Sequence, residues 1–476
     1  MHFHRRFRQR GGPPVTPEEF RKSGHQAIDW VADYLTNPGR YPVLARVKPG
    51  ELTDALPARG PEQGEPPECL LADFERLILP AVTHWNHPGF MAYFANSGSA
   101  PGILGELLAS ALNSNAMLWK SCPAAVELEQ VTLRWLRQWT GLPEDWFGQI
   151  FDTASIGSMH GLAAAREAAE PASRAKGMAP GLVVYTSEQA HSSIEKGAIA
   201  IGFGQENVRK VPVDAEFRMR TDALAELIAR DRAAGLRPCV VAATVGTTAT
   251  TSVDPVCAIA EICRANELWL HVDAAYAGSA AVADEFRWVL AGCEHADSMV
   301  TNPHKWMLTP CDCSVFYTRH PDVLRRAFSL VPDYLKTDDA PRAVNLMDYG
   351  VALGRRFRAL KVWFVMRSYG REGIAATIRE HVRMAQTVAA RVDAHPRFER
   401  TAPTPFSTIC FRYQGSDAEN RQIQEAVNET GEFFISGTKL HGRYTLRMAI
   451  GNMHTTQAHV DRAWELIQAE AAKLAG

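Results

Sequence analysis

Residues 268–307 read LWLHVDAAYAGSAAVADEFRWVLAGCEHADSMVTNPHKWM, and they carry the clearest sign of the chain's architecture. Two short β-branched runs, LWLHV and DSMVT, are separated by a helix-like stretch, the pattern of one βαβ unit. Asp273 ends the first run, and Lys305 follows the second run, 32 residues later. Ligands of open α/β sheets bind beyond the carboxyl ends of the strands. We therefore expect Asp273 and Lys305 to end neighbouring strands and to face one cleft.

The same alternation continues on both sides of this stretch. The strand-like runs GLVVYTS, RPCVVAATVGTT and CSVFYT alternate with the helix-like stretches TDALAELIARDRAAG and DPVCAIAEICRANE. Continuous apolar runs are typical of parallel strands whose two faces are covered by helices. The sequence therefore predicts an α/β fold class, with a large domain over residues 100–370 that holds a mostly parallel sheet flanked by helices.

The two ends of the chain follow other patterns. Residues 1–15 begin Arg-rich, continue with Gly-Gly-Pro-Pro and are predicted to be a disordered arm. Thr16 and Glu19 fit a capping box that opens a helix, and residues 16–99 are predicted to be a helical N-terminal segment. The apolar face of its first helix is predicted to hold Phe20, Ala27, Ile28, Val31 and Leu35. A long helix, three strand-like runs and a closing helix predict a small α+β domain over residues 371–476.

Composition narrows the class of protein. The 476 residues include 51 Lys and Arg against 53 Asp and Glu, a balance that argues against binding nucleic acid through bulk charge. No apolar stretch approaches the roughly 20 residues that a membrane span needs, so we expect no membrane association. Nine scattered Cys fit a reducing compartment and predict a soluble, cytoplasmic protein. Cys311 and Cys313 lie near several His, but no H-E-x-x-H or paired C-x-x-C occurs, and we expect no metal site.

Three local patterns allow two interpretations each. Asp273 and Lys305 are either an ion pair or the carboxylate and lysine that hold pyridoxal phosphate (PLP). The run Asp152-Thr-Ala-Ser155 opens a helix-like stretch and is either ordinary N-capping or a phosphate site. His191 follows the strand-like LVVYTS and is either an ordinary histidine or a ring that lies flat on a planar cofactor. No Walker loop or G-x-G-x-x-G after a strand offers another phosphate site.

Taken together, the runs AHSSIEKGA, HVDAAYAGSA and NPHKWM resemble the aromatic L-amino-acid decarboxylases, which are group II PLP decarboxylases of fold type I. Family-like sequence extends from about residue 16 to 470, including VTHWNHPGFMAYF and LGRRFRALKVWFVMRSYG. The resemblance implies that Lys305 forms a Schiff base with PLP, Asp273 binds the pyridine nitrogen and His191 stacks on the ring. It implies further cofactor contacts from Ala154, Ser155, Thr248, Ala275, Asn302 and His304.

The resemblance also implies a substrate pocket and a reaction. The aromatic pocket maps to Trp85, Tyr93, Phe94, Asn96, Met117 and Gly354. Asn96 stands where animal members carry Thr, and Met117 where they carry Phe. A small residue at position 354 leaves room for an indole, so tryptophan is favoured over tyrosine, phenylalanine and dopa. No arginine stands out in the sequence as a clamp for a side-chain carboxylate.

In the family, a loop corresponding to residues 329–345 closes over the partner subunit's site, and its tyrosine donates a proton. That tyrosine is Tyr334 here, whereas relatives with Phe tend to be aldehyde synthases. The resemblance thus implies a homodimer with shared sites, clasped by the N-terminal helices, that decarboxylates an aromatic amino acid. The alternatives are decarboxylation of another amino acid, an aldehyde synthase, or a scaffold without activity. An intact Lys305, Asp273 and His191 argue against the scaffold.

Overall fold

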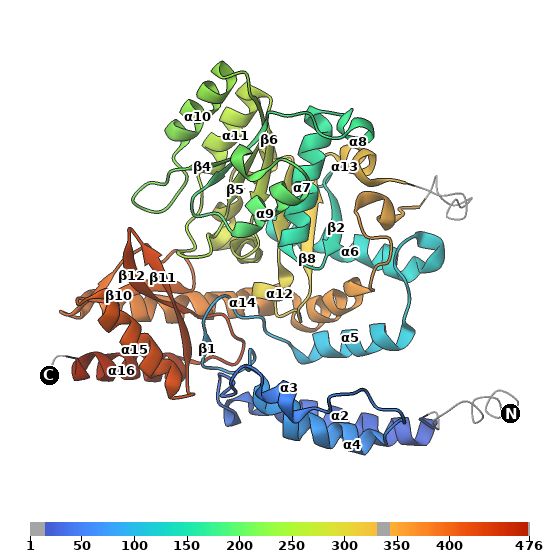
Figure 1. Ribbon diagram of the computed structural model, residues 1–476, viewed down its shortest axis with the longest axis vertical. Coiled ribbons are helices and arrows are strands. Elements are labelled where there is room, and N and C mark those ends of the chain that lie inside the picture. Colours follow the sequence, from blue (N-terminus) through green and yellow to red (C-terminus); the bar gives the residue numbers. More distant parts are fainter. Residues whose placement is uncertain (1–14, 331–342, 475–476) are drawn as a thin grey trace, which may run out of the picture.

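The computed structural model describes residues 15–330 and 343–474. The predicted arm lies outside the described residues except for Val15, and Tyr334 also lies outside them. Figure 1 shows a large α/β body, a smaller red and orange unit to one side, and a blue helical segment at one end. No helix among the described residues has the length and apolar character needed to cross a bilayer.

The large body is built on a seven-stranded sheet with the order β2-β8-β7-β6-β5-β3-β4. Its strands are β2 (Phe147–Phe151), β3 (Leu182–Ser187), β4 (Val208–Val211), β5 (Arg237–Thr244), β6 (Trp269–Asp273), β7 (Ser298–Thr301) and β8 (Ser314–Thr318). Only β8 runs against the other six, because it pairs antiparallel with both β2 and β7. The predicted mostly parallel sheet is confirmed. Strands β6 and β7 pair in parallel, with Asp273 opposite Val300, so their carboxyl ends lie side by side as expected.

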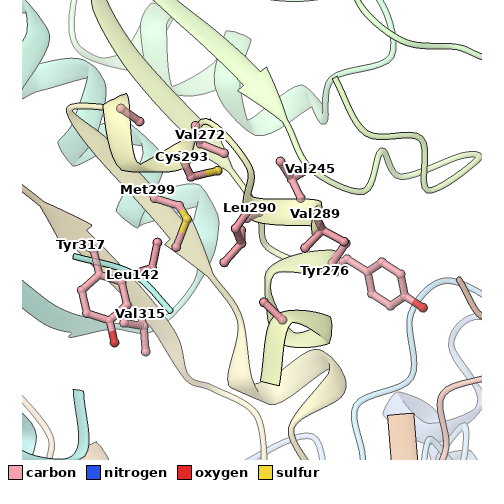
Figure 2. Packing of buried hydrophobic residues seen from close by; sticks show 14 of the residues in the cluster. Leu142, Val245, Val272, Tyr276, Val289, Leu290, Cys293, Met299, Val315 and Tyr317 are labelled. Carbon is pink, nitrogen blue, oxygen red and sulfur yellow. The ribbon is translucent and has the colours of Figure 1, made fainter. Parts of the chain in front are cut away.

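The helices of the large body are α5 (Ala100–Leu112), α6 (Pro123–Thr140), α7 (Ala154–Ala169), α8 (Ser173–Lys176), α9 (Ser192–Ala200), α10 (Thr221–Ala233), α11 (Val256–Asn266), α12 (Pro303–Trp306) and α13 (Pro321–Phe328). Helices α6, α7, α10 and α11 pack directly against the strands of the sheet. Figure 2 shows the core beside the sheet, where Val272 of β6, Met299 of β7 and Val315 of β8 pack with Val289, Leu290 and Cys293. Tyr276 lies at the edge of this cluster, and its hydroxyl points away from it.

A long helix joins the large body to the smaller unit. Helix α14 runs from Arg358 to Ala394 and is kinked at Gly370, whose φ of 63° is a left-handed conformation that favours glycine. The helix predicted to begin near residue 371 is therefore the second half of a longer one. Its first half packs on α5 and α6, and its second half packs on β9 and β10.

The smaller unit is a five-stranded sheet with the order β1-β11-β12-β10-β9. Its elements are β1 (Phe90–Met91), β9 (Phe398–Arg400), β10 (Thr408–Tyr413), β11 (Phe434–Leu440), β12 (Arg443–Ala449), α15 (Asp417–Glu429) and α16 (Gln457–Lys473). Strand β1 comes from the N-terminal segment and pairs in parallel with β11. A Cβ at Gly89 would lie 2.0 Å from the Glu432 carbonyl oxygen, so only glycine permits this pairing.

The N-terminal segment contains α2 (Pro17–Thr36), α3 (Glu51–Ala55) and α4 (Pro67–Asp73). Helix α2 begins with the predicted capping box, in which the Glu19 N–H donates to the Thr16 hydroxyl at 3.2 Å. The helix predicted to end at Pro80 continues from α4 through a π turn at Phe74–Ile78 and a 3-10 turn at Leu79–Ala81. No residue of α2 is buried within the single chain, and Phe20 is 70% exposed. The predicted apolar face of α2 is therefore only partly covered: Ala27, Val31 and Leu35 are half-buried, whereas Phe20 and Ile28 are exposed.

Candidate active site

Lys305 lies in α12, the short helix that follows β7. The turn is held from both sides, because the Lys305 N–H donates to the Asn302 carbonyl at 2.9 Å and the Cys313 N–H donates to His304 Nδ1 at 2.9 Å. Burial lowers the pKa of Lys305, the Asp273 carboxylate opposes this shift, and the Arg447 guanidinium adds to it. A lowered pKa increases the neutral fraction of the amine, which is its nucleophilic form.

Asp273 ends β6 beside this turn and is 5% exposed. Its carboxylate accepts the Ala275 N–H at 3.1 Å. Within the described residues, no Lys, Arg or His nitrogen lies within 4.0 Å of the carboxylate, so the simple Asp273–Lys305 ion pair is not formed. A buried carboxylate without a cationic partner is costly unless a ligand supplies the partner. Asp273 is therefore placed to bind a protonated group of a ligand.

His191 stands opposite, as the N-cap residue of α9. The Ser193 N–H donates to His191 Nδ1 at 3.2 Å, and the Ser193 hydroxyl lies 2.8 Å from the same nitrogen. Burial lowers the pKa of His191, with a smaller contribution from Lys305 that Asp273 opposes. The ring is thus oriented by its own helix and favoured in the neutral form, which suits stacking on a planar ligand.

The N-terminus of α7 closes the far end of the same cavity. The Thr153 hydroxyl accepts the Ile156 N–H at 3.4 Å as the helix cap, and the N–H groups of Ala154 and Ser155 belong to the first turn. First-turn N–H groups have no helical acceptor and attract anions. The cavity has a volume of about 190 Å³. Its lining includes all the predicted cofactor residues: Ala154, Ser155, His191, Thr248, Asp273, Ala275, Asn302, His304 and Lys305.

A second, wider cavity adjoins the first and shares His191 and Lys305 with it. Four of the six predicted substrate residues line it: Trp85, Tyr93, Phe94 and Asn96. The Lys305 Nζ atom lies 5.1 Å from the centre of the Phe94 ring, which forms a wall common to both cavities. The aromatic wall and the lysine therefore face the same space.

Arg447, on β12, lines this second cavity and was not singled out from the sequence. It is 4% exposed, and it donates to the Tyr93 carbonyl at 2.6 Å and the Ala249 carbonyl at 3.0 Å. Its other terminal nitrogen, Nη2, is buried without a hydrogen-bond partner, and no carboxylate among the described residues lies within 4.0 Å. A buried guanidinium without an anion is an arrangement ready for a carboxylate ligand.

Arg447 also stabilises an unusual backbone conformation at the cavity wall. Tyr93, whose carbonyl it binds, has a φ of 49°, the left-handed region that a bulky residue rarely adopts. The guanidinium carbon lies 4.8 Å from the centre of the neighbouring Phe94 ring. Strained backbone of this kind is retained where the surroundings hold it, and such positions cluster at functional sites.

Met117 and Gly354 do not line either cavity of this chain. Their segments instead lie together elsewhere, because the Ala116 N–H donates to the Arg355 carbonyl at 2.9 Å and the Arg355 N–H donates to the Asn115 side chain at 3.0 Å. Their assignment to the substrate pocket stays a prediction.

The sequence comparison matches residues 49–414 to the pyridoxal-dependent decarboxylase conserved domain. The chain belongs to the pyridoxal-dependent decarboxylase family. Among its relatives, tryptophan decarboxylase TDC2 of Camptotheca acuminata is 40% identical over 97% of this chain and 96% of that protein. Phenylacetaldehyde synthase of Arabidopsis thaliana is 39% identical over 97% of each protein. The crystal structure of Oryza sativa TDC with PLP and tryptamine superposes with a TM-score of 0.94 at 37% identity, covering 97% of this chain and 99% of that one.

The family confirms the predicted cofactor, and the cavity of this decarboxylase fits PLP. Lys305 would offer the amine, Asp273 a carboxylate without a cationic partner, and the first turn of α7 N–H groups for the phosphate. The buried Asn302 Oδ1 has no partner within the described chain and faces the same cavity. When bound, PLP supplies an electron sink for the bond that breaks at the substrate Cα.

Proposed function

We propose that this decarboxylase converts an aromatic L-amino acid to its arylalkylamine and CO2. The observation that carries the proposal is that two adjoining cavities share Lys305: one is also lined by Asp273, and the other is walled by Trp85, Tyr93 and Phe94. Flat apolar walls suit an indole or phenyl ring. The proposal covers tryptophan, tyrosine, phenylalanine and dopa.

Each residue of the site has a distinct task in this reaction. Lys305 would hold the cofactor through its amine. Arg447 would bind the substrate carboxylate and fix its direction, and the His191 ring would pack against the cofactor. Asp273 would bind the protonated ring nitrogen, which would strengthen electron withdrawal by the cofactor.

Tryptophan is our proposed preferred substrate. The Trp85 ring stacks on Phe90 at 4.3 Å and on Tyr93 at 5.9 Å, which builds a broad aromatic surface at the mouth of the cavity. The named activity of the Camptotheca acuminata relative and the tryptamine in the Oryza sativa structure support this choice. Asn96 adds an amide to the wall, which gives a hydroxylated ring a hydrogen-bond partner and keeps tyrosine and dopa within the proposal.

Replacing Arg447 with glutamine is expected to raise KM for the amino acid about 10- to 100-fold, because a charge-assisted hydrogen bond contributes about 1.5–3 kcal/mol. Inhibition by the amine product, which has no carboxylate, should change little. Steady-state kinetics with both ligands measure the two effects. Arg443→Gln, at the exposed end of the same strand, is the matched control. Equal weakening of amine and amino acid would show that Arg447 acts only on the shape of the pocket.

We propose that the enzyme is a homodimer with shared sites. Helix α5 exposes Leu104, Leu107, Leu108 and Leu112, whose spacing places them on one side of the helix. The exposed Val351 and Leu353 stand next to Gly354 in the segment bonded to residues 115–116. In a second copy seated on this surface, Met117 and Gly354 would complete the neighbour's substrate pocket.

Substituting both Leu104 and Leu108 with glutamate is expected to convert the dimer into an inactive monomer, because two charges would be buried at the contact. Analytical ultracentrifugation reports the mass and an amine assay reports the activity. Ile199→Glu, an exposed apolar position on α9, is the control. A fully active monomer, in this variant or in the wild type, would contradict the shared site.

Oxidative formation of an aldehyde is the second candidate, favoured by the 39% identity to phenylacetaldehyde synthase. We propose that Tyr334 keeps the enzyme on the amine route by protonating the substrate carbon. The wild type is then expected to release amine and CO2 without ammonia, and Tyr334→Phe to consume O2 and water and to release aldehyde, CO2, ammonia and hydrogen peroxide. Mass spectrometry and an ammonia assay distinguish the routes. Aldehyde as the main wild-type product would overturn the proposal.

We also propose a cytoplasmic location. All nine Cys are free thiols, and five of them are buried: Cys239, Cys263, Cys293, Cys313 and Cys410. Buried thiols of this kind pack as small apolar side chains and are preserved best in a reducing compartment.

A further inference from the structure

A buried histidine in the second half of α14 bonds to the residue that follows the catalytic lysine. His381 is 2% exposed, and its Nδ1 accepts the Trp306 indole N–H at 3.0 Å. An indole nitrogen can only donate, so Nδ1 carries no proton and the proton is on Nε2. That nitrogen lies 3.1 Å from the Asn452 carbonyl oxygen and donates to it. Both ring nitrogens of a neutral imidazole are therefore used.

The Trp306 side of this bridge leads to the lysine through stacked rings. The Trp306 ring stacks on Tyr276 at 4.7 Å with an interplanar angle of 10°. Tyr276 stacks in turn on Phe94 at 3.9 Å and 15°, and Phe94 forms the wall under Lys305 Nζ. The Tyr276 hydroxyl forms a hydrogen bond of 2.6 Å with the hydroxyl of Ser407, which lies in the linker before β10. The orientation of Trp306 thus fixes a stack that ends at the reacting amine.

The Asn452 side leads to the substrate wall. The Asn452 side-chain amide donates to the Trp85 carbonyl at 2.7 Å, and its Oδ1 accepts the His454 N–H at 2.8 Å. Trp85 lines the substrate cavity. His381 therefore links the turn that carries Lys305 to the segment that carries Trp85 by hydrogen bonds. These two segments are more than 200 residues apart in the chain.

The surroundings keep His381 in the form that both bonds require. Burial lowers the pKa of His381 to about 4, and this shift is opposed by the hydrogen bond to the Asn452 carbonyl and by the charge of the exposed Glu380, the preceding residue. The imidazole thus stays neutral across the working range of a PLP enzyme, and one tautomer satisfies both partners.

We infer that His381 is a positioning residue for the proposed reaction. Through Trp306 and Asn452, it fixes the position of the turn that carries Lys305 relative to Trp85. The inference rests on the proposed function. It predicts a division of effects: loss of the Trp306 bond should lower kcat, loss of the Asn452–Trp85 bond should raise KM, and loss of His381 should do both.

Four variants test this division on the PLP-loaded enzyme. His381→Leu removes both bonds, His381→Gln keeps an acceptor and a donor, Trp306→Phe removes only the N–H, and Asn452→Ala frees Trp85. We expect about tenfold lower kcat for His381→Leu and Trp306→Phe, the effect of one neutral hydrogen bond. We expect about tenfold higher KM for His381→Leu and Asn452→Ala, and partial rescue of both values in His381→Gln. The double variant His381→Leu with Trp306→Phe should lose no more kcat than His381→Leu alone.

Hydrogen exchange of the cofactor-free protein gives a readout that does not depend on activity. Faster exchange in His381→Leu should be confined to peptides around residues 85–90 and 302–308, with recovery in His381→Gln. Multiplicative losses in the double variant, or unchanged kinetics per folded molecule with faster exchange throughout, would overturn the inference. If the wild type makes no amine but the local exchange pattern is as expected, the proposed function is refuted, whereas the positioning of Trp306 and Asn452 by His381 is supported.

Discussion

Replacing Lys305 with alanine is expected to abolish amine formation, with a loss of about 10⁴-fold, the upper end of what one positioned acid or base contributes. Among the described residues that line the cavity, Lys305 is the only lysine, so the variant loses the amine that we propose holds PLP covalently. The protein should still fold, because the Lys305 side chain makes no hydrogen bond or ion pair within the described chain. Its contact is the Phe94 ring, at 5.1 Å.

Three measurements separate loss of chemistry from loss of structure in this variant. The amine is quantified by mass spectrometry, the cofactor by its visible absorption, and the fold by circular dichroism. Lys196→Ala, an exposed lysine on the neighbouring α9, is the matched control and should keep full activity. Turnover above a few per cent in Lys305→Ala would mean that the cofactor is held by another residue.

Replacing Asp273 with alanine is expected to lower kcat about 10²- to 10³-fold, the cost of removing one preorganised electrostatic group. The carboxylate is buried at the end of β6 and lies free of other cations, so nothing else in the cavity can hold the proton on the ring nitrogen. Asp273→Asn should lose a similar factor because it keeps the shape and removes the charge. Asp284→Asn, at a largely exposed aspartate, is the control.

The pair of substitutions at Asp273 decides between charge and packing. Asp273→Asn with wild-type turnover would show that the carboxylate has only a structural role. The absorption spectrum of the bound cofactor, recorded without substrate, is a second measure of the carboxylate's role. Loss of the proton on the ring nitrogen should change this spectrum in both Asp273→Ala and Asp273→Asn.

The central part of the fold could be predicted because its signals are local. Strands β5, β6 and β7 are continuous apolar runs, and Asp273 and Lys305 follow two of them, so their meeting at one edge needed only the rules of parallel sheets. The capping box at Thr16 is equally local. The resemblance to the decarboxylases implies a role for each residue, and these roles stay predictions.

The missed features depend on contacts distant in sequence. Strand β4, VRKV, is a half-exposed edge strand with two charges, and the two-residue β1 exists only because Gly89 lets it approach β11. Helix α14 was expected to begin near residue 371, because the local sequence does not show that Gly370 only kinks a helix that begins at Arg358.

The location of Arg447 at the substrate cavity could not be predicted for a related reason. Arg447 is the second of two arginines in the run RYTLRMAI, and a charge between the apolar Leu446 and Met448 was the available signal. Whether such an arginine faces solvent or a cavity depends on the packing of β12 against Tyr93 and Ala249, which are about 350 and 200 residues away. The separate location of Met117 and Gly354 likewise required the three-dimensional structure.

The most direct test of the account is a competition among substrates. Purified protein loaded with PLP is given tryptophan, tyrosine, phenylalanine, dopa and glutamate at equal concentration, and mass spectrometry follows every product. We predict arylalkylamines, with tryptamine formed fastest and no product from glutamate. Amine from glutamate alone, or no amine from any aromatic amino acid, would contradict the assignment of Trp85, Tyr93 and Phe94 as an aromatic substrate pocket.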